Sequence, residues 1–125
     1  MHAVLAEDAD PGIVKLLIER GADVNVADHE KWTALHFAGR DHKAPIVGVL
    51  LEAGAKADPV DSFGDTPLWR AVTKNADIAI VKALVEHGAD PYKRNNHDVA
   101  PIDMARTVGR DDIVALLEAR APRTQ

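Results

Sequence analysis

A turn followed by two helices recurs along this chain, and this recurrence constrains the fold more than any other feature. Thr33 and Thr66 each precede a short apolar run. Gly21 and Gly54 each end a second apolar run, and the interval between these glycines equals the interval between the two threonines. The interval from Gly54 to Gly88 is longer, which predicts one extra residue between the helices of that copy. Self-similarity at a fixed period predicts a solenoid of stacked units.

The stretch from Asp61 to Asp90 contains one complete copy of the unit. Thr66 and Pro67 predict a helix start, because threonine can cap a free backbone N–H and proline fits the first helical position. Gly88 follows an apolar run and predicts a helix stop, since glycine adopts the left-handed conformation without a Cβ clash. Residues 61–65 are rich in turn formers. Each unit should therefore hold a turn, two short helices and an exit loop.

Gly64 lies inside that turn and is expected to have a positive φ angle. In the preceding copy, the same place is occupied by Lys31. A lysine with positive φ is mildly strained, because its Cβ crowds the backbone there.

These motifs resemble those of the ankyrin repeat family. Its Thr-Pro-Leu-His helix start is matched by Thr33-Ala34-Leu35-His36 and, in part, by Thr66-Pro67-Leu68, and its Gly-Ala-Asp exit recurs at Gly88. The resemblance covers the chain from Met1 to about Ala121 and implies an all-α ankyrin repeat solenoid whose turns project as fingers. The expected repeats are about 1–27, 28–60, 61–94 and 95–121, followed by a short tail at 122–125.

The two ends of the array depart from this pattern. Met1 aligns with Trp69, so the first repeat is expected to lack its turn and its helix start. In the degenerate last repeat, Ala100 stands where Thr66 stands, which removes the threonine cap. Terminal repeats are expected to be atypical, because one face has no neighbour. An incompletely capped first repeat predicts self-association or fraying through residues 1–17.

The second helix of each unit is expected to bury its apolar residues against the neighbouring repeats. Leu50 and Leu84 hold the same place in adjacent copies and should both be core residues. In the first repeat, the helix should begin at Asp10-Pro11. Its apolar face would consist of Ile13, Val14, Leu16, Leu17 and Ile18.

Composition argues against several classes of function. The formal net charge of -5 argues against nucleic acid as a partner, because phosphate binding requires a basic surface. The chain has no cysteine and therefore no disulfide and no thiolate metal site. No apolar run approaches the length that spans a bilayer, and residues 1–10 lack the features of a signal peptide. We expect a cytoplasmic protein without membrane contact.

No catalytic, cofactor or metal motif stands out. No histidine pair has the i,i+4 spacing of a helical zinc site. The family resemblance instead implies that His36 hydrogen-bonds Thr33 and nearby turn backbone. Asp61 and Asp65 could form a carboxylate pair, but turn aspartates ordinarily bond backbone N–H groups. The chain also lacks a nucleophile elbow, a phosphate loop and a dinucleotide fingerprint. Catalysis is therefore the least favoured hypothesis, and we expect no cofactor.

The family resemblance also implies a binding surface, because equivalent variable positions of stacked repeats line up along one concave face. That strip mixes both charge signs with aromatic side chains, which suits a protein partner. The leading hypothesis is non-catalytic protein–protein recognition; a dedicated inhibitor, such as an immunity protein that neutralises a toxin enzyme, is the alternative. The expected partner-binding residues are His29, Glu30, Trp32, Arg40, Asp41, Ser62, Phe63, Asp65, Thr73, Lys74, Asn96, His97, Val99 and Thr107.

Trp32 is the most informative of these positions. It is equivalent to Asp65 and Val99, and a position that accepts aspartate is not expected to lie in the core. Trp32 is therefore predicted to be an exposed anchor at a finger tip. In the alternative, it packs back over the neighbouring finger. Trp69 stands at the place of His36 and should be partly buried between repeats.

Overall fold

The structure is a computed structural model that describes residues 10–119. Within this range the chain forms α-helices and no β-strand beyond an isolated bridge between Ala27 and Thr33. The helices are α1 (Pro11–Glu19), α2 (Ala34–Arg40), α3 (Ala44–Glu52), α4 (Pro67–Thr73), α5 (Ile78–Glu86), α6 (Pro101–Thr107) and α7 (Asp111–Ala119).

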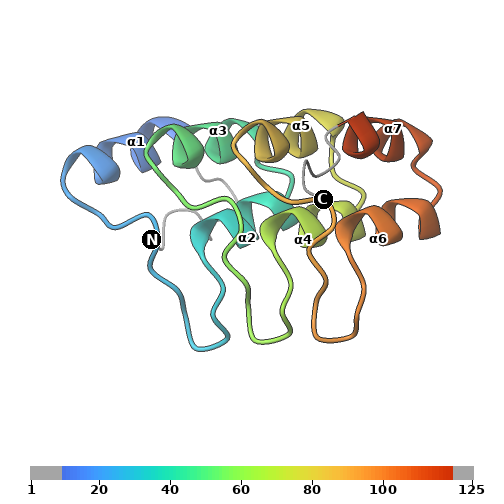
Figure 1. The fold of residues 1–125 in the computed structure, drawn as a ribbon. Coiled ribbons are helices and arrows are strands. Elements are labelled where there is room, and N and C mark those ends of the chain that lie inside the picture. Colours follow the sequence, from blue (N-terminus) through green and yellow to red (C-terminus); the bar gives the residue numbers. More distant parts are fainter. Residues whose placement is uncertain (1–9, 120–125) are drawn as a thin grey trace.

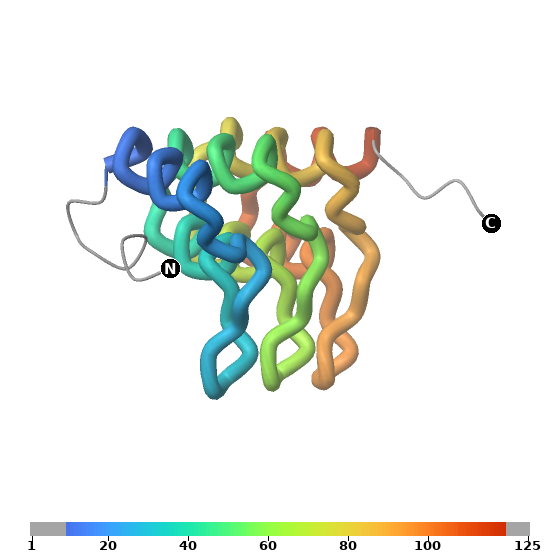
Figure 2. The backbone as a smooth tube through the Cα atoms, turned by 90° about the vertical axis from the view of Figure 1, so that its left-hand side faces the viewer, coloured from blue at the N-terminus to red at the C-terminus, as the bar shows by residue number. Residues whose placement is uncertain are grey.

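The helices form two parallel rows (Figure 1). One row contains α1, α3, α5 and α7, and the other contains α2, α4 and α6. Three long turns project from the second row, and Figure 2 shows them side by side and pointing the same way. We call them the Asp28 finger (28–32), the Asp61 finger (61–65) and the Asn95 finger (95–99). The predicted all-α repeat solenoid is confirmed.

The helix starts follow the predicted capping chemistry. The Thr33 hydroxyl accepts the His36 N–H at 3.4 Å, and the Thr66 hydroxyl accepts the Trp69 N–H at 3.2 Å. Ala100 has no side-chain acceptor, as its sequence position predicts. The carboxylate of Asp103 instead accepts the Ala100 N–H at 3.0 Å, so half of the capping box remains.

The predicted difference in loop length between the repeats is also present. In the second repeat α2 ends at Arg40 and α3 begins at Ala44, whereas in the third α4 ends at Thr73 and α5 begins at Ile78. The loop of the third repeat is thus longer by one residue.

The core lies between the two rows and runs along the whole stack. Leu50 and Leu84 are fully buried at their equivalent places, as predicted, and Leu117 continues the series in α7. Leu35, Leu68 and Ile102 form the matching series in the first helices. Each repeat thus completes the core of its neighbour, and this explains why short helices are stable in this chain.

The exit loops of successive repeats are also joined by side-chain hydrogen bonds. The side-chain oxygen of Asn25 accepts the Lys56 N–H at 2.9 Å. One repeat later, Asp58 accepts the Asp90 N–H at 2.9 Å with one carboxylate oxygen, while the other is buried without a hydrogen-bond partner in the described part of the chain. Burial raises the pKa of Asp58 to about 6.

Helix α1 buries only part of its predicted apolar face. Asp10 caps it as predicted, accepting the Gly12 N–H at 2.8 Å. Of its expected apolar face only Val14 is buried, with Ile18 packed against the core. Ile13, Leu16 and Leu17 are exposed, because α1 packs mainly against α3 on one side. The predicted absence of a turn and helix start in the first repeat concerns residues 1–9, outside the described residues. Self-association through this end of the array stays a prediction.

Candidate functional site

Each of the three fingers is closed by the side chain of its first residue. Asp28, Asp61 and Asn95 each accept two backbone N–H groups with one side-chain oxygen, at 2.9 to 3.0 Å. Aspartate and asparagine favour such turns, because their short side chains reach the backbone two residues ahead. The donors are Glu30 and Trp32, Phe63 and Asp65, and His97 and Val99.

Backbone hydrogen bonds join neighbouring fingers. The Ser62 N–H donates to the carbonyl of Glu30 at 2.9 Å, and the Asn96 N–H donates to the carbonyl of Phe63 at 3.0 Å. The Asn96 side chain adds a bond to the Ser62 carbonyl at 3.1 Å. The fingers therefore form one connected strip, which lowers the entropy that a partner must remove on binding.

Gly64 and Lys31 have the predicted backbone conformation, with φ angles of 80° and 65°. A Cβ atom on Gly64 would lie 2.8 Å from the Asn96 backbone nitrogen, so the close approach of the next finger also requires glycine there.

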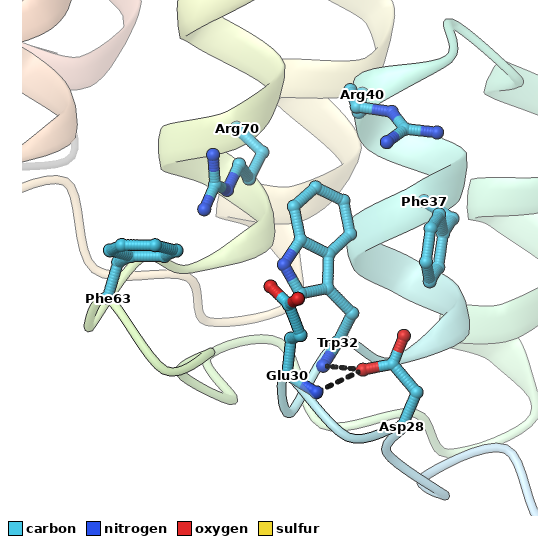
Figure 3. A pocket seen from close by; sticks show the side chains of 7 residues that line it. All are labelled: Asp28, Glu30, Trp32, Phe37, Arg40, Phe63 and Arg70. Atoms are coloured by element: carbon cyan, nitrogen blue, oxygen red, sulfur yellow. Dashed lines mark hydrogen bonds between the residues drawn. The ribbon is translucent and has the colours of Figure 1, made fainter.

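Trp32 lies at the base of its finger, so its predicted placement at the tip is wrong. Its carbonyl accepts the Asp28 N–H at 2.9 Å, which leaves residues 29–31 as the tip. The indole is half-buried, and its ring centroid lies 5.5 Å from that of His36. The Phe37 ring, with its centroid at 4.7 Å, lies on the other side of the indole from Phe63 (Figure 3). The alternative of a packed tryptophan fits better, although Trp32 packs onto α2 of its own repeat rather than onto the neighbouring finger.

Asp65, at the position equivalent to Trp32, is buried rather than exposed. Asp65 is only 3% exposed, although aspartate was expected to mark a surface position. Its carboxylate accepts the Asn95 side-chain N–H at 2.7 Å and pairs with Arg70 at 2.9 Å. Burial raises the pKa of Asp65, while the Asn95 and Arg70 donors oppose that shift. A polar residue can thus be buried where the next repeat supplies its partners.

His36 has the structural role that the family resemblance implies. Its Nδ1 accepts the Thr33 N–H at 3.1 Å. Its Nε2 lies 2.8 Å from the Asp65 carbonyl, which can only accept, so Nε2 carries the proton. Burial lowers the pKa of His36, which favours this neutral tautomer.

Arg70 is the central side chain of this region, and the sequence analysis did not identify it. Its guanidinium donates to Asp61 at 2.8 and 3.0 Å and also pairs with Asp65. The same guanidinium lies 4.6 Å from the Trp32 ring centroid and 5.9 Å from that of Phe63. No sequence signal marks this residue, because the equivalent position of the preceding repeat is Phe37.

Two pockets open between the fingers and adjoin at Phe63 and Arg70. The first, which we call the Trp32 pocket, has a volume of about 390 Å³ (Figure 3). The second, the Trp69 pocket, has a volume of about 340 Å³. The Trp32 pocket is lined by Asp28, Glu30, Trp32, Phe37, Arg40, Phe63 and Arg70. The Trp69 pocket is lined by Phe63, Asp65, Trp69, Arg70, Asn95, His97, Val99 and Met104.

About half of the expected partner-binding residues lie in these pockets. Glu30, Trp32, Arg40 and Phe63 line the Trp32 pocket, and Phe63, Asp65, His97 and Val99 line the Trp69 pocket. The remaining expected residues line neither pocket, and they are His29, Asp41, Ser62, Thr73, Lys74, Asn96 and Thr107.

Several of these remaining residues have local structural bonds. Thr73 donates to the Trp69 carbonyl at 2.8 Å, and Thr107 donates to the Asp103 carbonyl at 2.9 Å. Asp41 holds Arg40 through two hydrogen bonds of 2.7 and 3.0 Å.

The pocket residues that were not among the expected partner-binding residues are Asp28, Phe37, Trp69, Arg70, Asn95 and Met104. Trp69 is half-buried, as predicted, and its indole nitrogen is buried without a hydrogen-bond partner among the described residues. Phe37 and Trp69 could have been predicted as binding residues from the sequence, because both are aromatic residues in the first helices of their repeats, next to the fingers.

The surface of the fingers thus contains two pockets, aromatic side chains and ion pairs that a binding partner could contact. Within residues 10–119 no group of three or more His, Cys, Asp or Glu side chains could hold a metal ion. None of the helices in that range is long and apolar enough to cross a membrane.

Comparisons with known proteins agree with the repeat architecture. Residues 1–95 match the family model described as ankyrin repeats, three copies. An ankyrin repeat protein of fowlpox virus is 34% identical over 116 residues, which cover 89% of this chain and 34% of the relative. The RelA-associated inhibitor of Mus musculus is 39% identical over 71% of this chain and 10% of its own length. The neurogenic locus Notch protein of Drosophila melanogaster is 35% identical over 86% of this chain and 4% of its own. The chain thus spans about a third or less of these relatives.

Proposed function

Because the chain belongs to the ankyrin repeat family, whose repeats are protein-interaction modules, we propose that it binds a protein partner through its fingers and first helices. The observation that carries this proposal is the pair of adjoining pockets between the fingers, with Phe63 between them. Phe63 is 50% exposed, and an exposed phenylalanine in a rigid strip is a favourable anchor for a partner.

The composition of the strip supports this use. Binding hot spots are enriched in tryptophan, tyrosine and arginine at the centre of an interface. Trp32, Trp69 and Arg70 lie around Phe63, and Arg70 is held in place by Asp61. Because these side chains are already packed and paired, little conformational entropy is lost when a partner binds.

The test compares two exposed apolar side chains, one in a finger and one in the row of helices that bears no finger. A partner is first recovered with the wild-type chain by affinity purification and mass spectrometry, and then titrated against variants. We expect Phe63→Ala to weaken binding by about 2 kcal/mol, roughly thirtyfold. The matched control is Ile78→Ala, because Ile78 is 39% exposed but begins α5 in the other row.

Thermal melts of both variants separate binding from folding. Both substitutions should change folding stability by no more than about 1 kcal/mol. Equal binding by Phe63→Ala and the wild type would show that the fingers are not the recognition surface. If the recovered partner is an enzyme that loses its activity in the complex, the dedicated inhibitor becomes the better description of the same surface.

A further inference from the structure

The two arginines that line the Trp32 pocket are already paired within the protein. Arg40 is held by Asp41 through hydrogen bonds of 2.7 and 3.0 Å. Arg70 is shared by Asp61 and Asp65, at 2.8 and 2.9 Å. An acidic side chain of a partner would therefore compete with internal carboxylates for both guanidinium groups, which makes this pocket a poor anion site.

Two carboxylates of the same pocket pair with no cation within residues 10–119. Asp28 accepts only backbone N–H groups of its own finger, and the Glu30 side chain has no hydrogen bond or ion pair among the described residues. In Figure 3 the Glu30 carboxylate lies on the side of Trp32 that faces Phe63, and the Asp28 carboxylate lies on the side of Trp32 that faces Phe37. The Trp32 ring already faces the guanidinium groups of Arg40 and Arg70, at 5.1 and 4.6 Å from its centroid. The gain for a guanidinium or ammonium group of a partner is therefore the ion pair with a carboxylate that has no cation of its own in the described part of the chain.

The Trp69 pocket has a different character. Its walls are mainly the side chains of Phe63, Trp69, Val99 and Met104. The Asp65 carboxylate in this pocket is already bonded to Asn95 and Arg70, so it offers little to a charged ligand. This pocket of about 340 Å³ therefore suits an apolar side chain such as that of leucine.

The spacing of the two pockets restricts the backbone that can reach both. The pockets lie one repeat apart, because α2 packs on α4 and α4 packs on α6. Packed helices are separated by about 8–10 Å. A polyproline-II segment rises about 3.1 Å per residue with three residues per turn, so its residues i and i+3 point the same way about 9 Å apart. Same-side residues of a β-strand lie about 7 or 13 Å apart and fit less well.

We propose that the Trp32 pocket and the Trp69 pocket together bind a polyproline-II segment of a partner that carries an arginine or lysine three residues from an apolar side chain. The basic side chain occupies the Trp32 pocket beside Glu30, and the apolar one occupies the Trp69 pocket. This inference rests on the proposed function and names the chemistry that the same surface recognises.

The test uses a capped peptide of sequence Leu-Pro-Pro-Arg-Pro-Pro-Leu, in which either chain direction places a leucine three residues from the arginine. The chain has two tryptophans, one in each pocket, so the two indole N–H signals in a ¹H–¹⁵N spectrum report the pockets separately. We expect both signals to shift and saturate on titration. A peptide with glutamate in place of arginine should bind more weakly, and Leu-Pro-Arg-Pro-Leu should lose the Trp69 response.

Glu30→Gln tests the charge argument, with Glu52→Gln as the control because Glu52 is an exposed glutamate on α3 in the other row. We expect Glu30→Gln to lower affinity for the arginine peptide by up to about fivefold and to leave the glutamate peptide unaffected or slightly improved. Glu52→Gln should change neither. Equal binding of the arginine and glutamate peptides, full binding of the shorter peptide, or unmoved indole signals at millimolar peptide would overturn the inference. The finger surface would still be supported as a recognition site if Phe63→Ala weakens binding of the recovered partner.

Discussion

The second and third repeats share a backbone but differ in how they use equivalent positions. The position before the threonine cap is Trp32 in one repeat and Asp65 in the next. Trp32 packs half-buried against Phe37, whereas Asp65 is buried in an ion pair with Arg70. The repeat sequence therefore determines the backbone position of a side chain. The residues of the neighbouring repeat determine whether a polar or an apolar side chain can be buried at that position.

The core should be the part in which the two repeats behave alike. Leu50 and Leu84 are both 0% exposed at equivalent places. We expect Leu50→Ala and Leu84→Ala each to lower the free energy of unfolding by about 2–5 kcal/mol, through lost burial and the cavity left behind. Urea denaturation measures this loss. A loss below about 1 kcal/mol in either repeat would show that the equivalence of the two leucines is wrong.

The two arginines of the Trp32 pocket should differ sharply. Arg70→Ala leaves Asp61 and Asp65 buried without their cation, so we expect a loss of about 2–4 kcal/mol of folding stability. Arg40→Ala breaks a more exposed pair with Asp41 and should cost about 0.2–1 kcal/mol. Similar losses in the two variants, measured by urea denaturation at neutral pH, would contradict the distinction between the buried and the exposed pair.

The exit loops offer a comparison that depends on pH. Asn25 and Asp58 accept equivalent backbone N–H groups, but only Asp58 bears a charge, and burial raises its pKa from 3.8 to about 6. The folded state therefore binds the proton more tightly than the unfolded state. Stability from this group is full below about pH 4 and is lost as the pH rises to about 6.

Asp58→Asn removes this titration and retains an oxygen acceptor for the Asp90 N–H. We expect the variant to be more stable than the wild type by about 1–2 kcal/mol at pH 7, with little difference at pH 4. Urea denaturation at pH 4, 5 and 7 measures the difference in the free energy of unfolding between the variant and the wild type. A variant that is less stable than the wild type at pH 7 would contradict the prediction that the charged Asp58 side chain destabilises the fold. So would a difference in the free energy of unfolding that is the same at all three pH values.

The smallest effect is expected at the finger tips, where Lys31 and Gly64 are equivalent residues with positive φ. Lys31→Gly should stabilise the protein by a few tenths to about 1 kcal/mol, because it removes backbone strain. The reverse change, Gly64→Lys, should destabilise it, since a new Cβ would lie 2.8 Å from the Asn96 nitrogen. Thermal melts that show the same sign for both exchanges would exclude this explanation.

The sequence was sufficient for features whose causes lie within one repeat. The Thr33 and Thr66 caps and the positive φ angles of Gly64 and Lys31 depend on residues within a few positions, so their motifs predict them. The regular interval at which these motifs recur likewise predicts the stacking that buries Leu84.

The features that were missed depend on contacts between repeats. Asp65 is stabilised by Asn95 from the next finger, and Trp32 is covered by Arg70 from the next repeat. Neither contact has a sequence signature, because the equivalent residues of other repeats differ. The α1 helix shows the same limit, since its periodicity identifies the apolar residues but not which of them are buried, as Val14 is and Leu16 is not.

The closure of each finger by its own first residue has a consequence for how such a surface evolves. Asp28, Asp61 and Asn95 hold the loops through backbone N–H groups, so the bonds do not depend on the side chains in between. His29 and His97 are exposed side chains in these loops that the closure does not use. Substitutions at these positions can therefore change the binding specificity of one finger without changing the hydrogen bonds that hold the finger in place. Duplication followed by divergence of single loops is thus an accessible route to new partners.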